Sequence, residues 1–121
     1  MLDILKGLER TKYCGEFTEK ELDHEVVAMG WVSHRRDFGD LVFVDLRDRS
    51  GMLQVVFDRS KFLGDFSKVD KLRSEFVIAV IGVLHKRDED TIDPKSKTGY
   101  IEIRVKDLKI LSTSLAPKIT G

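Results

Sequence analysis

The hydrophobic pattern of this chain changes its period once, and the position of that change constrains the fold more than any other feature. In residues 61–73 the apolar side chains recur at spacings of three and four, which predicts an amphipathic helix. The pattern predicts three strands before this segment and two after it. Five short strands with one helix between the third and the fourth is the arrangement of an OB-fold barrel. The sequence therefore predicts a mainly β protein, a five-stranded OB-fold barrel; a split α+β domain of sheet and helix is the alternative.

Turn residues separate the predicted strands. The strands are expected at residues 25–36, 41–48, 52–58, 76–87 and 100–111. Residues 37–40 and 49–51 have the composition of turns. Gly30, inside the first strand, indicates a bend or a close approach of two backbones. The alternation of inward and outward residues slips near Lys106 in the fifth strand, which predicts a β-bulge at that point.

The length of 121 residues fits one compact domain. We expect a short lead-in at residues 1–9, the OB-fold domain at residues 10–112 and a linker toward a further domain at residues 113–121. No apolar run is long enough to cross a membrane. Cys14 is the only cysteine, which excludes a disulfide framework and favours the reducing cytoplasm. Its expected role is that of a small buried residue.

The charges of the chain balance, with 21 Lys plus Arg against 21 Asp plus Glu. A protein that holds nucleic acid mainly through its phosphates usually carries a basic excess. Any nucleic-acid function of this chain must therefore depend on specific contacts, or on a partner domain that supplies positive charge.

Polar and aromatic side chains converge on the face that an OB-fold uses for its ligand, which is formed by strands 2 and 3 and by the loops joining strands 1–2 and 4–5. Phe43 lies on the opposite phase from its apolar neighbours, and Gln54 interrupts an apolar run. An aromatic ring stacks on any base, an amide offers a donor and an acceptor, and a carboxylate accepts from base N–H groups. The other candidates are Arg35 and Arg36 at the end of the first strand, Glu102 in the fifth strand, and His85, Lys86 and Arg87 beside the 4–5 loop.

Each candidate also has an ordinary structural explanation. Phe43 could pack against a neighbouring domain, and Gln54 could be an outward polar residue of an antiparallel strand. Glu102 alternates with isoleucines, so a solvated strand face accounts for it as well. The Arg35–Asp37 segment could form nothing more than surface ion pairs, which contribute little to stability.

No catalytic or metal-binding set emerges from the sequence. The three histidines, His24, His34 and His85, have no metal-ligand spacing to one another or to the cysteine. Glycine-rich phosphate loops and nucleophile motifs are absent. The sequence alone predicts a binding module with no catalytic residues, no metal ligands and no cofactor.

Four segments of the sequence resemble a known family over residues 10–111. They are RTKYCGEF (10–17), GWVSHRRDFGDLVFVDLRDRSGMLQVVFD (30–58), LRSEFVIAVIGVLHKRDE (72–89) and TGYIEIRVKDLKIL (98–111). They are similar to the N-terminal anticodon-binding domain of bacterial-type aspartyl-tRNA synthetases, class II enzymes whose subgroup also contains the asparaginyl and lysyl enzymes. The first segment and the DLRDRSG turn favour the aspartyl branch.

The resemblance implies an OB-fold that reads the anticodon of aspartate tRNA, and it implies roles for individual residues. Phe43 matches the phenylalanine that stacks on the anticodon bases, and Gln54 matches the glutamine that reads the middle uracil. Glu102 matches the glutamate that recognises the first base, a guanine or its modified form. Arg36 and Arg87 match arginines of the anticodon contact region.

The chain departs from the family pattern at a few positions. His34 replaces a third arginine, which weakens one expected phosphate contact or makes it pH-dependent. Thr91 and Asp93 occupy positions where some relatives carry asparagines that contact tRNA. Phe38 and Asp90 lie where family members differ in rejecting asparagine tRNA, so the sequence leaves open whether that tRNA is a second partner.

The family's catalytic motifs have no counterpart in this chain. The resemblance implies a parent enzyme that activates aspartate with ATP and Mg²⁺ and transfers it to tRNA, works as a cytoplasmic homodimer, and carries its catalytic domain after residue 121. We expect the 121 residues to bind the anticodon without catalysing the reaction. Three alternatives remain: a general single-strand-binding module, the anticodon domain of an asparaginyl enzyme, and a protein-interaction barrel anchored by Phe43.

Overall fold

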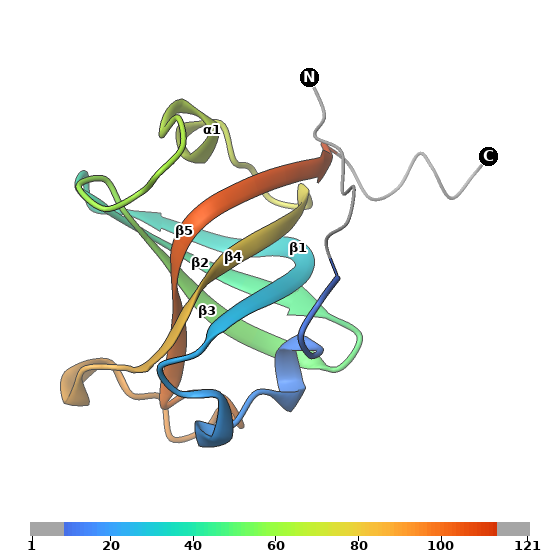
Figure 1. Cartoon of the computed structure of the whole chain (residues 1–121), viewed down its shortest axis with the longest axis vertical. Coiled ribbons are helices and arrows are strands. Elements are labelled where there is room, and N and C mark those ends of the chain that lie inside the picture. The colour runs from blue at the N-terminus through green and yellow to red at the C-terminus, as the bar shows by residue number, and fades with distance from the viewer. Residues whose placement is uncertain (1–8, 114–121) are drawn as a thin grey trace.

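Five strands close into a barrel with the neighbour order β1-β2-β3-β5-β4 (Figure 1). The computed structural model describes residues 9–113. The strands are β1 (Glu25–Asp37), β2 (Leu41–Asp48), β3 (Gly51–Asp58), β4 (Val77–Lys86) and β5 (Ile101–Ser112). All neighbours pair antiparallel except β3 and β5, which are parallel. This architecture confirms the predicted OB-fold barrel and the predicted strands, whose ends agree to within a residue.

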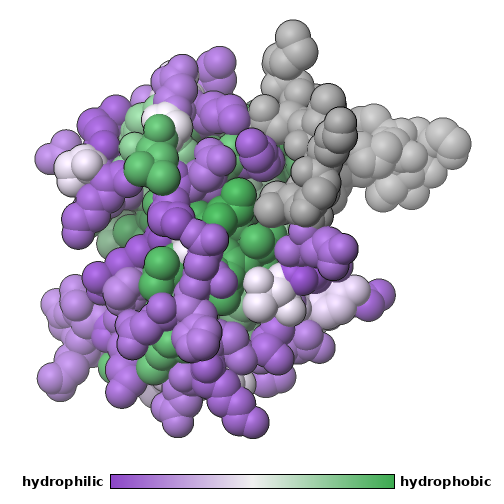
Figure 2. Space-filling model, viewed as in Figure 1, coloured by the Kyte–Doolittle hydropathy of each residue, from purple (hydrophilic) through white to green (hydrophobic). Residues whose placement is uncertain are grey.

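Alternation along the strands produces the core. In β2, Val42, Val44 and Leu46 are fully buried, while the residues between them turn outward. Each large apolar side chain buried in this way stabilises the fold by about 1.5–3 kcal/mol. The face drawn in Figure 2 is mostly hydrophilic, with hydrophobic patches between the hydrophilic side chains.

Gly30 lies where the backbones of β1 and β2 approach each other closely, as the sequence indicated. A Cβ atom at this position would lie 2.3 Å from the carbonyl oxygen of Arg47 on the neighbouring strand. A side chain at residue 30 would therefore collide with the neighbouring strand, and only glycine allows the two backbones to lie this close together. The β-bulge predicted near Lys106 is also present, because Ile81 pairs with Asp107 while Gly82 pairs with Val105.

The helix between β3 and β4 is much shorter than the sequence pattern predicted. The prediction of a helix over residues 61–73 is wrong in its length, since α1 spans only Ser67–Asp70. The segment before α1 is tied to the barrel, because the N–H of Leu63 donates to the carbonyl of Lys106 on β5 at 3.0 Å, where a continuous helix would bond it to the carbonyl of Arg59. The apolar residues at this spacing, such as Phe62 and Phe66, pack against the core without forming one continuous helix. The short α1 lies over one end of the barrel (Figure 1).

Short 3-10 turns complete the described residues: η1 (Cys14–Glu16) and η2 (Glu19–Glu21) precede β1, and η3 (Glu89–Thr91) lies between β4 and β5. Within residues 9–113 no helix has the length and apolarity needed to span a membrane. The predicted lead-in at 1–9 and linker at 113–121 lie almost entirely outside the described residues.

Candidate nucleic-acid interface

A β-bulge in β1 decides which arginine reaches the predicted ligand face. Val32 pairs with Leu46 and His34 pairs with Asp45, so Ser33 is an extra residue without a partner on β2. The bulge reverses the alternation of β1, because each inserted residue moves the following side chains to the other face. Arg36 therefore stands outside the barrel next to Phe43, its partner in the β1–β2 ladder.

Four polar side chains form a continuous hydrogen-bonded chain across this face. Arg36 donates through Nη2 to Oε1 of Gln54 at 3.1 Å, and Gln54 donates through Nε2 to Oε1 of Glu102 at 2.9 Å. Arg104 donates through Nε to Oε2 of Glu102 at 3.2 Å. The parallel register of β3 and β5 sets Gln54 directly beside Glu102. We call Arg36, Gln54, Glu102 and Arg104 the polar chain.

The two central members of the polar chain are not solvated surface residues. Gln54 is 4% exposed and Glu102 is 7% exposed. The explanation of both residues as solvent-exposed polar positions on a strand is therefore wrong, because neighbouring side chains cover them. Buried polar groups require partners, and these two residues supply partners for each other. Each keeps spare capacity: one amide N–H and one lone pair on Gln54, and further lone pairs on Glu102.

Phe43 stands between two hollows that flank the polar chain. The smaller, of about 350 Å³, is lined by Arg36, Phe38, Phe43, Gln54, Arg87, Thr91 and Asp93. The larger, of about 630 Å³, contains Glu102 and Arg104 and shares Phe43 and Thr91 with the smaller. Phe38, which is 67% exposed, packs edge-on against Phe43 with ring centroids 5.7 Å apart. The face thus has an aromatic ridge with a hollow on each side, and each hollow contains part of the polar chain.

Arg87 holds the loop between β4 and β5 in place. Its Nε donates to the carbonyl of Ile101 at 3.0 Å and its Nη1 donates to the carbonyl of Thr91 at 3.1 Å. Burial lowers the pKa of Arg87, while the nearby carboxylate of Glu102 acts in the opposite direction. Two backbone contacts leave this guanidinium less free than a simple phosphate anchor would be.

His85, opposite Glu102 in the β4–β5 ladder, lines the larger hollow. Burial, followed by the positive charge of Arg104, lowers the pKa of His85. The lowered pKa favours the neutral imidazole, which can both donate and accept hydrogen bonds.

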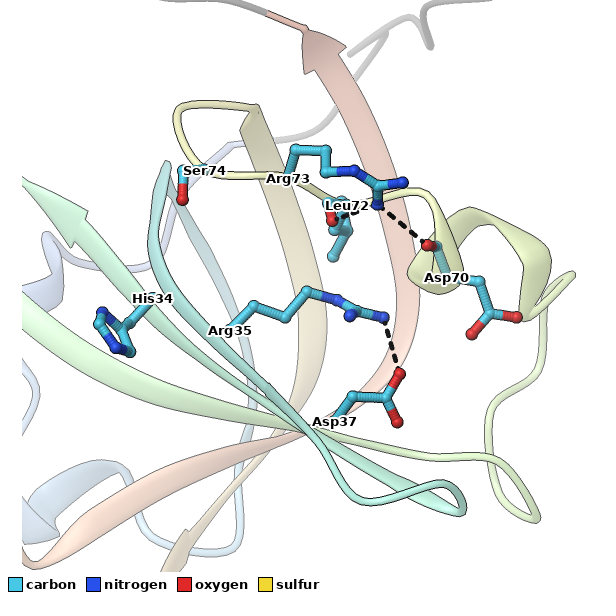
Figure 3. A pocket seen from close by; sticks show the side chains of 7 residues that line it. All are labelled: His34, Arg35, Asp37, Asp70, Leu72, Arg73 and Ser74. Atoms are coloured by element: carbon cyan, nitrogen blue, oxygen red, sulfur yellow. Dashed lines mark hydrogen bonds and ion pairs between the residues drawn. The ribbon is translucent and has the colours of Figure 1, made fainter.

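Arg35 does not join the predicted face. It points into a separate pocket of about 610 Å³ beside α1, which His34 and Arg73 also line (Figure 3). Arg35 donates through Nη2 to Oδ2 of Asp37 and to the carbonyl of Val69, each at 3.3 Å. The ion pair that the sequence suggested is present. A role of Arg35 or His34 in nucleic-acid binding stays a prediction, and the geometry separates both from the Phe43 ridge.

Sequence reasoning missed Arg104, which completes the polar chain. The signal was available, because Arg104 follows Glu102 by two residues and so shares its face of β5. The described residues contain no group of three or more His, Cys, Asp or Glu side chains placed to hold a metal ion. Cys14 is fully buried, as predicted, and burial together with the Asp48 carboxylate raises the pKa of its thiol.

Residues 26–111 match the tRNA anti-codon family, described as "OB-fold nucleic acid binding domain". The chain belongs to this family. As an OB-fold nucleic acid binding domain, it matches the sequences of aspartate–tRNA ligases over nearly its whole length. The Aspartate–tRNA(Asp/Asn) ligase of a Thermoanaerobacter species is 51% identical over 97% of this chain and 20% of that protein. The Aspartate–tRNA ligase of Staphylococcus epidermidis is 46% identical over 90% of this chain and 18% of that protein.

Solved structures give the same picture of the domain. The aspartyl tRNA synthetase of Entamoeba histolytica superposes with a TM-score of 0.78 at 21% identity, over 93% of this chain and 23% of that one, which shows the shared fold. The asparaginyl-tRNA synthetase of Pyrococcus horikoshii gives a TM-score of 0.70 at 26% identity, over 87% and 23% of the two chains. The chain spans about a fifth of the length of the ligases it matches in sequence.

Proposed function

We propose that this OB-fold domain reads the anticodon of aspartate tRNA for an aspartate–tRNA ligase. The observation that carries the proposal is the polar chain with spare hydrogen-bonding capacity, placed beside an aromatic ridge and between two hollows. Sequence-specific RNA recognition uses unstacked bases that stack on aromatic rings and pair through their edges. The similarity to aspartate–tRNA ligases supports the choice of RNA.

The middle base of the anticodon stacks on Phe43 and pairs with Gln54. The Gln54 amide has one orientation, because a flipped amide would turn its NH₂ toward Arg36 and its oxygen toward the Glu102 carboxylate. One N–H and one lone pair of fixed position remain free. Uracil places its donor at the ring N3 and cytosine places its donor at the exocyclic N4. An amide that cannot exchange its donor and acceptor therefore distinguishes the two pyrimidines.

The first base of the anticodon enters the larger hollow and pairs with Glu102. An ionised carboxylate accepts hydrogen bonds and donates none. Guanine is the base whose Watson–Crick edge presents two adjacent N–H groups, so it suits a carboxylate best. On the other side of Phe43, the smaller hollow receives the third base beside Arg87, Thr91 and Asp93.

Because the chain spans about a fifth of the ligases it matches, we place the activity of the whole enzyme in the rest of the parent protein. We propose that the parent protein attaches aspartate to tRNA with ATP and Mg²⁺, as a homodimer in the cytoplasm, and that its catalytic domain packs near this one. The described residues offer no cluster of metal-ligating side chains, and the sequence has no glycine-rich phosphate loop. We place ATP and Mg²⁺ in the rest of the enzyme on the family resemblance. Asparagine tRNA is a candidate second partner, because one similar ligase carries both tRNAs in its name.

A general single-strand-binding role fits the charge less well. Such proteins depend on a basic groove, and this chain has a net charge of zero. The neutral charge also predicts that the isolated domain binds more weakly than the full-length ligase.

Titration of the chain with an anticodon stem-loop, followed by backbone amide shifts, tests the proposed function. We expect shifts confined to the neighbourhood of Phe43, Gln54 and Glu102, and no comparable shifts with a stem-loop of unrelated loop sequence. Equal binding to the unrelated loop would contradict the proposal and favour the general single-strand binder. No binding to either loop would favour a protein-interaction barrel.

A further inference from the structure

We infer that Arg104 is a positioning residue that sets the preference for the first base by holding the carboxylate of Glu102. The inference rests on the proposed function, since Glu102 must be the group that meets that base. Neither the sequence pattern nor the family resemblance gave Arg104 a role, and its place in the polar chain is what points to one.

The Glu102 carboxylate is held from two sides by different elements. Gln54 on β3 donates to Oε1 at 2.9 Å, and Arg104 on the same strand as Glu102 donates to Oε2 at 3.2 Å. One donor on each oxygen fixes the plane of the carboxylate as well as its position. Glu102 lines the larger hollow, and a fixed carboxylate offers its remaining lone pairs there in a single orientation. Two adjacent N–H groups of a base need that orientation, because hydrogen bonds weaken steeply when they are misaligned.

The ion pair between Arg104 and Glu102 should be stronger when a base is bound than in the free protein. Its side chain is 47% exposed, while that of Glu102 is 9% exposed. An ion pair with one partner in water contributes little to the stability of the fold. A base that fills the hollow excludes water from the pair, and the attraction between the two charges then strengthens. The contribution of Arg104 should therefore appear in base preference and not in folding.

The polar chain also passes the effect of Arg104 to the middle base. Glu102 holds Nε2 of Gln54, so a carboxylate released from Arg104 loosens the amide as well. Arg36 still holds the amide oxygen from the other side at 3.1 Å. We therefore expect a large loss of preference at the first base and a smaller loss at the middle base. A side chain that only bound phosphate would produce neither pattern.

The test compares Arg104→Met with the wild-type chain on stem-loops carrying guanine or adenine as the first anticodon base. Loss of a charge-assisted hydrogen bond that positions Glu102 should reduce the guanine preference about ten-fold. Arg104→Lys keeps the charge and should restore part of the preference. Lys109→Met, which removes the same charge from a β5 residue paired with Asp107, is the matched control and should leave the preference unchanged.

Three results would overturn the inference. An unchanged guanine preference in a folded Arg104→Met chain would show that Glu102 needs no support. An equal loss of affinity for both stem-loops, with a salt dependence reduced by about one phosphate contact, would make Arg104 a phosphate ligand. A wild-type chain that binds both stem-loops equally would overturn the proposed reading of the first base, and this inference with it.

Discussion

Two polar networks in this barrel join segments that are far apart in sequence. They differ in how many of their hydrogen-bond donors and acceptors are used within the network. The first ties η1 to the turn between β2 and β3 through Asp48. Its carboxylate accepts from the backbone N–H of Cys14 at 2.7 Å and from the N–H and hydroxyl of Ser50 at 2.8 and 2.6 Å. The hydroxyl oxygen of Ser50 accepts from the N–H of Gly15 at 2.7 Å. We call these four residues the Asp48 network.

The second network is the polar chain, which keeps hydrogen-bonding capacity in reserve. Gln54 and Glu102 are nearly buried, yet each has donors or lone pairs that no described residue uses and that lie beside a hollow. In the Asp48 network the partners are mainly backbone groups next to a glycine whose Cβ would lie 2.3 Å from a carbonyl oxygen. A buried polar residue in a strand of this barrel therefore indicates a binding site only where some of its hydrogen-bonding groups remain unused.

The largest expected effect is the loss of stability on breaking the Asp48 network. Asp48→Ala removes an acceptor that binds three donors and leaves the N–H of Cys14 unpaired. We expect a loss of about 3 kcal/mol in the free energy of unfolding, measured by urea denaturation. The matched change in the polar chain, Gln54→Met, removes one hydrogen bond to Glu102 where Asp48→Ala removes three, so it should cost less, about 1–2 kcal/mol.

The opposite order of the two losses in the free energy of unfolding would contradict the distinction between the networks. A Gln54→Met chain less stable than Asp48→Ala would make the polar chain a structural network.

The next effect concerns binding. Phe43→Ala should weaken binding to the anticodon stem-loop by about 1–3 kcal/mol, because the stacking surface for a base is lost. Isothermal titration of the folded variant measures this change. Phe38→Ala removes a ring that is more exposed and only packs edge-on against Phe43, so it serves as the control with the smaller effect. If Phe43→Ala unfolds the domain, Phe43 belongs to the core and not to the ligand face.

The weakest expected change is a pH dependence of stability that comes from Asp48. Burial tends to raise the pKa of Asp48, but hydrogen bonds from Cys14 and Ser50 outweigh burial and hold it below its ordinary value. A carboxyl group with a lowered folded-state pKa stabilises the fold above its unfolded pKa, and this contribution is lost as the pH falls through the folded value.

Wild-type stability should therefore decline below about pH 4, more steeply than that of Asp48→Asn. Urea denaturation at several pH values measures both curves. Parallel curves for the two proteins would assign the acid sensitivity to other carboxylates.

Local sequence pattern predicted most of the fold. The strand ends and the outward phase of Phe43 follow from alternation within single strands. The helix prediction was wrong in length because the apolar spacing of Phe62 and Phe66 reports burial, whereas the N–H of Leu63 between them bonds to Lys106 on β5 and interrupts the helical hydrogen bonds. Apolar periodicity cannot reveal where the backbone N–H groups of a segment find their partners.

The sequence predicted most residues of the candidate site, but it could not predict which of them contact one another. Which of Arg35 and Arg36 reaches the face depends on the bulge at Ser33, and that bulge is a matter of register between β1 and β2. The link from Gln54 to Glu102 depends on the parallel pairing of β3 and β5, 48 residues apart in sequence. Such non-local pairings leave no periodic signal in a single chain.

The proposed reading of the middle base depends on the fixed amide of Gln54. Its most direct test is the affinity of wild type and Gln54→Met for two stem-loops that differ only in uracil or cytosine at that position. We predict that wild type prefers uracil by about ten-fold, as for one good bidentate contact, and that Gln54→Met binds both stem-loops equally. A folded Gln54→Met chain that keeps the wild-type preference for uracil would contradict the account.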